Sequence, residues 1–406
     1  MSRAALLRSC SLALALTAAT SCKNASFPFK KSPAATPAAP GATPSRSPEE
    51  AAFLEKCAAL GASGGSLAGR DGWFFSSTEL QRLALLQDPA APSIKAATAA
   101  IADYHAQLKA KGIELVFVPV PPKAILFPDK LSKDLKIKLR RNQPARLDSS
   151  LQSTYAQLRS QGIRVIDLTE PLLASREDRK LGPIFPKTAA TWAPRGAQTA
   201  AATIAAELKD LPWPHPPSDP LISEAATLSY TGPLPSAPAP AESLPLRNIG
   251  RSADGKMRSV TFSQGGHPLA LIGDASLLAW REANNPVGSA NAFASLADQL
   301  AFELQTTPDL FPSKADGRNA ARLAILRDGT NGRNPLGSAK VVLWVVQATD
   351  LALSDWKLVP LRLQFNLTQP QLLLSDPSKS PPLPPSPPAA DSPAPDSPPA
   401  LPELPR

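Results

Sequence analysis

The sequence predicts one α/β domain, in which a mostly parallel β-sheet is covered by helices on both faces. Three observations support this prediction. Two helix-then-strand units follow each other along the chain, further short apolar runs have the length of buried strands, and the longest proline-rich segments lie at the two ends. Alternating helices and short buried strands are typical of a parallel sheet. We expect this domain to span residues 49–370, followed by a disordered proline-rich tail at 371–406.

The two helix-then-strand units are read from periodicity. Apolar side chains recur at helical spacing over residues 94–108, and the β-branched and aromatic run 113–118 then has the length of a strand. The pattern repeats with a helical stripe at 147–158 and a strand at 163–168. A glycine follows each helix where a C-cap is expected, at Gly112 and Gly162.

The second half of the domain continues this alternation. The apolar runs 269–272 and 341–346 suit buried parallel strands, and residues 196–208 and 293–304 have the pattern of helices. Residues 212–255 break the alternation with prolines, so we expect a proline-rich excursion on the surface there.

The expected strands also indicate where a site should lie. In parallel sheets, ligands bind beyond the carboxyl ends of the strands. The loops 119–123 and 273–276 follow two of the predicted strands. We therefore expect both loops at the same edge of the sheet.

The first residues indicate export. Arg3 and Arg8 precede an apolar run of small residues at 12–19, which is too short for a permanent membrane-spanning helix. The run ends in Ala-Thr-Ser-Cys22, which resembles a bacterial lipobox. We expect residues 1–21 to be a lipoprotein signal peptide and Cys22 to carry lipid, which would leave the protein anchored to a membrane on its periplasmic side. An ordinary secretory peptide that is cut nearby is the alternative.

Cysteine usage agrees with a fold that depends on its core. Once Cys10 is removed and Cys22 is lipidated, only Cys57 remains, so no intramolecular disulfide is possible. Cys57 lies in a helical-looking stretch, and we interpret it as a small core residue rather than a reactive thiol.

Composition predicts a tether and limits the partners. Residues 22–48 are rich in Pro, Ala and Ser, which favours an extended, solvated tether. The formal charge is +9. Part of that excess lies between Asp129 and Arg146, in Lys130, Lys133, Lys136, Lys138, Arg140, Arg141 and Arg146. Outside the cytoplasm an anionic polysaccharide or lipid headgroup is a better partner for these cations than nucleic acid, and a merely solvated basic face is the alternative.

Six blocks, in order along the chain, resemble the family that includes the periplasmic alginate O-acetyltransferases. The blocks are 69–80 (GRDGWFF…EL), 112–123 (GIELVFVPVPPK), 165–168 (VIDL), 188–197 (TAATWAPRGA), 271–276 (LIGDAS) and 341–344 (VVLW). This resemblance implies a three-layer α/β/α SGNH-hydrolase-like (flavodoxin-like) fold. It also implies transfer of acetyl through a Ser-His-Asp triad, in which the serine follows a strand and the Asp and His precede it in the chain.

Carried over position by position, the triad of that family is replaced. The aspartate position holds Ala189, the histidine position Thr191 and the serine position Ala275. Alanine can neither attack nor orient, and a threonine hydroxyl is no base near neutral pH. The flanking motif residues, among them Trp192 and Asp274, fix these positions on either side.

Ser276 is the fallback nucleophile, one residue beyond the expected position. It would need a base, and the chain has only His105, His215 and His267. His267 precedes the strand that Ser276 follows, so up to about 30 Å separate them along nine residues of extended chain. No metal constellation, P-loop or dinucleotide fingerprint is visible, and we expect neither a metal nor a cofactor.

The leading hypothesis is therefore a catalytically inactive relative that binds exopolysaccharide or serves the O-acetylation machinery as an accessory protein. Its cleft candidates are Lys123, Trp192, Asp274 and Ser276. Two alternatives stay open. The first is an active O-acetyltransferase or acetylesterase with Ser276 as a relocated nucleophile, and the second is an envelope spacer.

Overall fold

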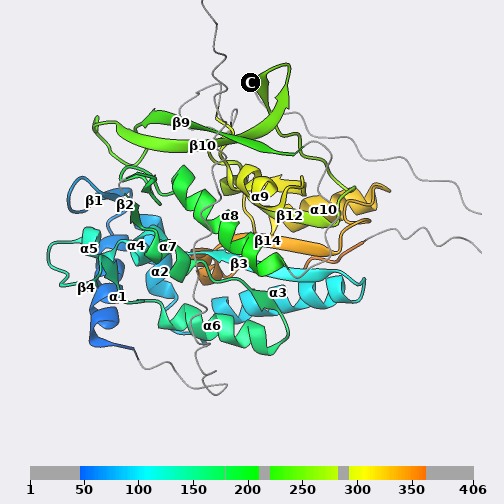
Figure 1. The fold of residues 1–406 in the computed structure, drawn as a ribbon. Helices are drawn as coiled ribbons and strands as arrows, with labels where there is room; N and C mark the ends of the chain where they lie inside the picture. The colour runs from blue at the N-terminus through cyan, green and yellow to red at the C-terminus, as the bar shows by residue number, and fades with distance from the viewer. Residues whose placement is uncertain (1–45, 179, 210–219, 282–291, 363–406) are drawn as a thin grey trace, which may run out of the picture.

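The computed structural model describes residues 46–178, 180–209, 220–281 and 292–362 (Figure 1). The expected signal peptide, Cys22, almost all of the tether and the tail at 371–406 lie outside the described residues. Within the described ranges, no helix is both long and apolar enough to cross a membrane.

A five-stranded sheet forms the centre of the fold. Its strand order is β13-β12-β14-β3-β6, and every neighbouring pair is parallel. The predicted parallel sheet is thus confirmed. The strands are β3 (Glu114–Val120), β6 (Arg164–Val165), β12 (Leu269–Asp274), β13 (Asp309–Ser313) and β14 (Val341–Gln347). Only β13 had no counterpart in the sequence prediction.

Helices cover both faces of this sheet. The chain passes from β3 to β6 through α6 (Ser149–Ser160), and from β12 to β13 through α9 (Leu296–Leu304). These two crossovers run in opposite directions across the sheet, so right-handed connections place α6 and α9 on opposite faces. Helix α8 (Pro194–Leu208) packs beside α9, and α3 (Pro92–Lys109) beside α6.

Helix α10 (Ala320–Thr330) joins the face that α3 covers. Its Arg322 is fully buried and stacks over the rings of Tyr104 and Trp344, at 5.4 and 4.8 Å from their centroids. The helices around the sheet therefore form the two outer layers of an α/β/α arrangement.

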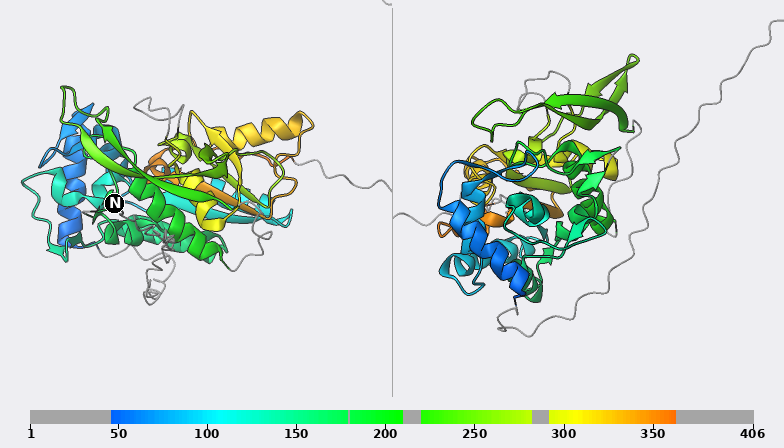
Figure 2. Two further views of the ribbon diagram at one scale, coloured as in Figure 1. Left: turned by 45° about the horizontal axis from the view of Figure 1, so that its top comes forward. Right: turned by 90° about the vertical axis from the view of Figure 1, so that its left-hand side faces the viewer.

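A second, antiparallel sheet lies outside these three layers. It consists of β9 (Ile222–Tyr230), β10 (Glu242–Ala253) and β11 (Lys256–Ser259), with β10 in the middle. Strand β10 packs on α8 and α9, and Figure 2 shows β9 and β10 as a separate layer at the top of its right-hand view. Buried side chains of both long strands, Leu228, Tyr230, Leu244 and Leu246, join Trp280 in a small core of their own.

This sheet corrects the expectation for residues 212–255, of which 220–255 are described. That segment lies on the outside of the domain, and most of its described part is β-structure, whereas the loop 231–241 between β9 and β10 carries four of its prolines. Its prolines do not prevent this. Pro245 lies in a part of β10 that pairs with β9 alone, and a strand tolerates a missing amide where one edge is free.

Many of the remaining elements lie at the carboxyl-terminal edge of the sheet. Helix α1 (Pro48–Gly61) packs on α2 (Ser77–Leu85), and Cys57 is buried and unpaired between core side chains. Burial raises the pKa of its thiol, which agrees with a structural role. The short elements are β1 (Ser66–Ala68), β2 (Phe74–Ser76), α4 (Lys123–Leu126), α5 (Pro128–Leu131), β4 (Leu139–Arg140), β5 (Gln143–Pro144), α7 (Thr169–Ala174), β7 (Glu177–Asp178), β8 (Gly182–Pro183), and the 3-10 turns η1 (Ala275–Leu278) and η3 (Ala348–Ala352). The elements at the carboxyl-terminal edge include α2, α4, η1 and η3.

Candidate functional site

A cavity of about 280 Å³, here called the rim cavity, opens at the carboxyl ends of the central strands. Val120 ends β3, Gln347 ends β14, and Ser276 follows β12. The loops 119–123 and 273–276 thus meet at one edge, as the strand pattern predicted. The cavity is lined by Ser76, Thr78, Glu79, Arg82, Val120, Phe185, Ala190, Thr191, Trp192, Ser276, Gln347 and Thr349.

Ser276 and Asp274 form a turn at the floor of the rim cavity. The Asp274 carboxylate accepts hydrogen bonds from the Ser276 hydroxyl at 2.5 Å and from the Ser276 amide at 2.8 Å. The Gln347 amide nitrogen lies 3.4 Å from both Asp274 Oδ2 and Ser276 Oγ. Ala275, at the serine position of the family motif, is exposed and begins the turn η1. The hydroxyl of Ser276 therefore donates to a carboxylate.

The loop 188–192 forms the opposite wall. Thr191, at the family's histidine position, is half-buried and lines the rim cavity. Ala189, at the aspartate position, is buried beside Tyr230 and Trp280. Trp192 also lines the cavity but is only 1% exposed, and its carbonyl accepts the indole N–H of Trp280 at 2.7 Å. Trp192 therefore serves mainly in packing.

Lys123, which we expected in the cleft, lies in the interior instead. It is 1% exposed, and its ammonium donates to the carbonyls of Phe74 and Lys187 at 2.8 Å and of Ala189 at 2.9 Å. Burial lowers the pKa of Lys123 to about 7, against the opposing effect of Glu79 and Glu242. Three carbonyl acceptors need three N–H donors, which only the ammonium form has. Lys123 thus fixes the backbone of the loop that forms the cavity wall, from the interior of the protein.

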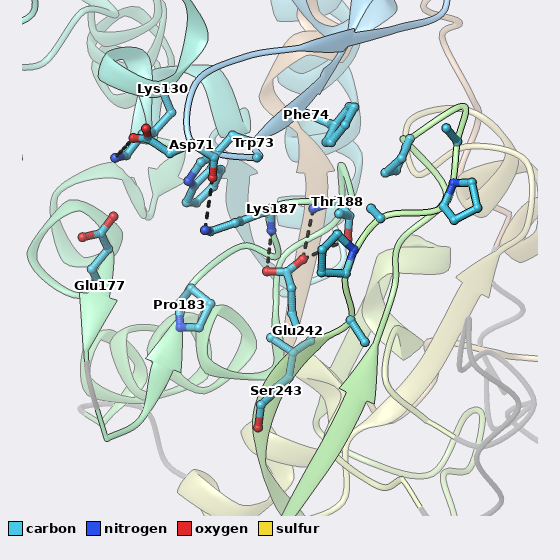
Figure 3. Close-up of a pocket in the computed structure, with 18 of the residues that line it drawn as sticks. Asp71, Trp73, Phe74, Lys130, Glu177, Pro183, Lys187, Thr188, Glu242 and Ser243 are labelled. Atoms are coloured by element: carbon cyan, nitrogen blue, oxygen red, sulfur yellow. Dashed lines mark hydrogen bonds and ion pairs between the residues drawn. The ribbon is translucent and has the colours of Figure 1, made fainter.

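A carboxylate holds the same loop from the other side (Figure 3). Glu242 accepts the Lys187 amide at 2.8 Å, and the amide and hydroxyl of Thr188 at 3.2 and 2.8 Å. The Thr188 hydroxyl also accepts the Gly232 amide at 2.8 Å. A Cβ at Gly232 would lie 2.2 Å from the Thr188 carbonyl, so this close approach requires glycine. The segment that carries two triad positions is therefore fixed at its backbone.

The described histidines lie away from Ser276. His267 precedes β12 and contacts Thr306 through Nε2 at 2.7 Å, at the amino end of the strand. His105 lies within α3, and its two ring nitrogens have no hydrogen-bond partner. His215 falls outside the described residues. Among the residues that line the rim cavity there is no histidine, and across the described ranges no group of three or more His, Cys, Asp or Glu side chains is arranged to hold a metal ion.

Two carboxyl groups with raised pKa values lie at the rim cavity, Glu79 in its lining and Asp350 as the ion-pair partner of the lining residue Arg82. Burial raises the pKa of Glu79 to about 6, although the Ala124 amide and Lys123 favour its charged form. Burial likewise raises the pKa of Asp350 to about 6, although Asp350 forms an ion pair with Arg82 at 2.8 Å. Carboxyl groups that titrate this close to neutrality are often found at functional sites.

A wider opening of about 1210 Å³, here called the proline-rimmed groove, lies on the other side of the loop 187–191 (Figure 3). Residues 235–241, with three prolines, form one wall. Asp71 lies on the opposite wall. Its carboxylate pairs with Lys130 at 2.7 Å, and its backbone carbonyl accepts a hydrogen bond from the Lys187 ammonium. Lys187 and Thr188 line this groove while Ala190 and Thr191 line the rim cavity, so one loop separates the two openings.

Sequence reasoning missed several residues of the rim cavity. Gln347 directly follows a predicted strand, and the rule that placed Asp274 at the rim applies to it equally. Glu79 belongs to a recognised block but was not considered as a site residue. Ser76 directly precedes α2, and Arg82 lies within it. No local pattern indicates that this helix reaches the edge of the sheet.

Comparison with known proteins agrees with this geometry. A family model described as "SGNH hydrolase-like domain, acetyltransferase AlgX" matches residues 67–276. "Probable alginate O-acetylase AlgJ" of Pseudomonas aeruginosa is 30% identical over 147 residues, which are 36% of this chain and 34% of that protein. The protein of the same name from Pseudomonas putida is 27% identical over 222 residues, 52% of this chain and 54% of the relative. This chain thus spans about half or less of these relatives.

Solved structures resemble the described fold as well. The "O-Acetyltransferase Domain of Pseudomonas putida AlgJ" matches with a TM-score of 0.50 and 24% identity, over 71% of this chain and 92% of that structure. This likeness establishes the fold.

Replacing Lys123 with methionine tests the backbone anchor of the cavity wall. Lys123→Met keeps the approximate length of the side chain but removes the ammonium from three carbonyls, of which the Lys187 carbonyl keeps the Phe74 amide as a donor. We expect the free energy of unfolding to fall by about 1–3 kcal/mol and amide hydrogen exchange in residues 187–191 to accelerate. The control is Lys130→Met, which removes a pair with the exposed Asp71 and is expected to cost less than about 1 kcal/mol. Equal effects of the two substitutions would contradict the anchor.

The buried carboxyl of Glu79 predicts a pH dependence. Its pKa is raised in the folded state, so the charged form costs stability, and that cost develops as the pH rises from about 4.5 to about 6. Glu79→Gln does not titrate. We therefore expect the variant to gain about 1–2 kcal/mol over the wild type between pH 4.5 and pH 7, measured by urea unfolding at both values. Glu55→Gln, on the exposed side of α1, is the control, and a pH-independent difference for Glu79→Gln would disprove the prediction.

Proposed function

We propose that this chain, which belongs to the family described as SGNH hydrolase-like domain, acetyltransferase AlgX, is a member that binds polysaccharide without transferring acetyl. One observation carries the proposal. The rim cavity and the backbone that holds its walls are intact, but Ala189, Thr191 and Ala275 stand where the family resemblance places the catalytic groups.

Acyl transfer needs a nucleophile, a base that takes its proton and a group that orients the base. Ala275 has no hydroxyl, and the Thr191 hydroxyl is a weak acid rather than a base. Neither described histidine lies at this edge of the sheet. The residues that remain can donate and accept hydrogen bonds, which suits binding a sugar.

The shape of the site supports a saccharide ligand. The rim cavity is slightly smaller than the roughly 300 Å³ at which ligand pockets usually begin, and it presents hydroxyl and amide groups from Thr191, Ser276 and Gln347. The proline-rimmed groove lies on the other side of the loop 187–191 and offers a second surface that a polymer could contact. Some relatives are named alginate O-acetylase. The first partner to test is therefore an O-acetylated polysaccharide or the machinery that acetylates it.

The proposal includes a place in the cell envelope. The residues that support it are Arg3, Arg8, the apolar run 12–19 and Cys22, which together suit a lipoprotein signal of residues 1–21 and a lipid anchor. Residues 22–48 then serve as a tether to the domain at 49–370, and 371–406 as a solvated tail. The protein would act as an accessory to exopolysaccharide modification on the periplasmic side of a membrane.

One contact favours a second candidate function. The Ser276 hydroxyl donates to Asp274 at 2.5 Å, and in an acetylesterase this carboxylate would take the proton as Ser276 attacked the acetyl carbon. A carboxylate is a much weaker base than imidazole, so we expect the binding role to hold.

Turnover and binding distinguish the two functions. We expect no hydrolysis of a chromogenic acetyl ester above background by the protein, and none by Ser276→Ala. We expect binding of alginate, measured by titration calorimetry on O-acetylated and de-acetylated samples. Ala190→Phe fills the rim cavity from an exposed position and should weaken that binding at least tenfold, whereas Ala110→Phe, at the far end of α3, should not. Turnover that Ser276→Ala abolishes would establish the esterase instead.

Restoring the catalytic groups tests whether the cavity keeps the geometry of the family. The triple variant Ala189→Asp, Thr191→His, Ala275→Ser returns a carboxylate, an imidazole and a hydroxyl to the positions that the resemblance assigns. We expect acetyl-ester turnover at least tenfold above the background rate, because the loop 187–191 is already held by Lys123 and Glu242. The matched control is the double variant without Ala275→Ser. A folded triple variant as inactive as the double would refute the retained geometry.

A further inference from the structure

A row of cations runs along one exposed edge of the molecule, over residues 133–141. Lys136, Lys138 and Arg140 are exposed, and they alternate with Leu135, which is buried, and Ile137, which packs on the core. Side chains two apart in an extended chain point to the same side. This alternation therefore places the three cations outward in a row, and Lys133 and Arg141 extend it at both ends.

These five side chains are not neutralised by the protein. The two flanking cations of the basic segment are paired, Lys130 with Asp71 and Arg146 with Asp148 and Asp167. By contrast, none of the five has an ion pair or a side-chain hydrogen bond within the described part of the chain. Three acidic groups lie nearby, and one of them, Glu177, accepts the side-chain amide of Asn142 in the hairpin at 3.1 Å. Asp134 pairs with Lys56, and Glu49 accepts the backbone amide of Lys138 at 2.8 Å.

The end of the row is shaped by a tight hairpin. Arg140 pairs with Gln143 in β4 and β5, and the two residues between them, Arg141 and Asn142, have φ of 52° and 65°. Both residues are left-handed, as a two-residue type I′ turn requires. The turn carries Arg141 at its tip, where the guanidinium is exposed.

One exposed apolar side chain, Leu139, neighbours the cations in the sequence and continues the series of Leu135 and Ile137 on the other side of the chain. Leu139 is 40% exposed. Elsewhere in the described residues, the exposed large hydrophobic side chains are Leu85, Leu181 and Leu358. Cations beside an exposed leucine suit the interface of an anionic membrane, where headgroups meet the amines and the acyl boundary receives the leucine. A polysaccharide chain offers no comparable apolar layer.

The position of the row also favours a membrane. Glu49, in the first turn of α1, contacts Lys138, so the described chain enters the fold beside the row (Figure 1). The proposed lipid-bearing Cys22 precedes the first described residue, Arg46, by 24 residues. A lipid anchor at Cys22 would hold this edge within reach of the bilayer.

We propose that Lys133, Lys136, Lys138, Arg140, Arg141 and Leu139 form a membrane-docking face that binds anionic phospholipid headgroups. This face lies apart from the residues that line the rim cavity, and it does not depend on the binding role proposed for that cavity. Docking would orient the domain relative to the membrane.

Vesicle binding tests the docking face directly. The protein to use is residues 22–406 with Cys22→Ser, which keeps every described residue and carries neither signal peptide nor lipid. Vesicles of phosphatidylcholine, alone or with 30% phosphatidylglycerol, are sedimented at about 0.1 M salt. We expect binding only to the anionic vesicles. Each basic residue near such a surface strengthens binding by about fivefold, so changing all five cations to glutamine should lower it at least tenfold.

The control removes the same charge elsewhere, by changing Lys109, Lys209, Lys256, Lys314 and Arg327 to glutamine. Retained binding in this control, with a smaller loss for Leu139→Asn, supports the docking face. If the control loses as much vesicle binding as the five-cation variant, binding depends on net charge alone, and the proposal is overturned. It is overturned as well if no vesicle is bound, or if soluble polygalacturonate retains the protein through the same five residues while vesicles do not.

Discussion

The site depends on one buried cation. The Lys123 ammonium sits at the start of α4, directly after β3 and its Pro-Pro turn, and it reaches the carbonyls of Phe74, Lys187 and Ala189. Burying an ammonium is costly unless every donor is used. Here all three are used, and the rings of Trp73 and Phe75, with centroids 5.0 and 5.3 Å from Nζ, provide further stabilisation. Two segments far apart in the sequence, at Phe74 and at 187–189, are thereby fixed to the carboxyl end of one strand.

The opposite side of the rim cavity is positioned by close backbone contact. A Cβ at Gly273 would lie 2.7 Å from the Val345 carbonyl, so β12 and β14 approach as closely as they do only because residue 273 is glycine. That approach sets Asp274 and Ser276 within 3.4 Å of the Gln347 amide. The cavity is thus bounded by Lys123 and its carbonyls on one side and by glycine-mediated strand packing on the other.

Sequence periodicity predicted the parts of this fold that depend on local pattern. The apolar runs before Val120 and Gln347 indicated buried strands, and the strand rule placed the two loops of the rim correctly. The second sheet was missed because its prolines were given more weight than its turn, although Asp254-Gly255, both with positive φ, is a strong hairpin signal. The burial of Lys123 had no local signal. A lysine is ordinarily exposed, and the three carbonyls that make its burial possible are brought together only by the tertiary fold.

The same distinction accounts for the proposed replacement of the catalytic groups in a fold of this family. The loop that carries Ala189 and Thr191 is held through its backbone, by carbonyls that accept from Lys123 and by amides that donate to Glu242. None of these bonds involves a side chain at a triad position. Replacing an Asp or a His there removes polar groups that would themselves need partners, so the loss of chemistry costs the scaffold little. Selection for binding alone would therefore keep Lys123, Glu242 and the glycines while the triad positions change, and these are the residues on which the site still depends.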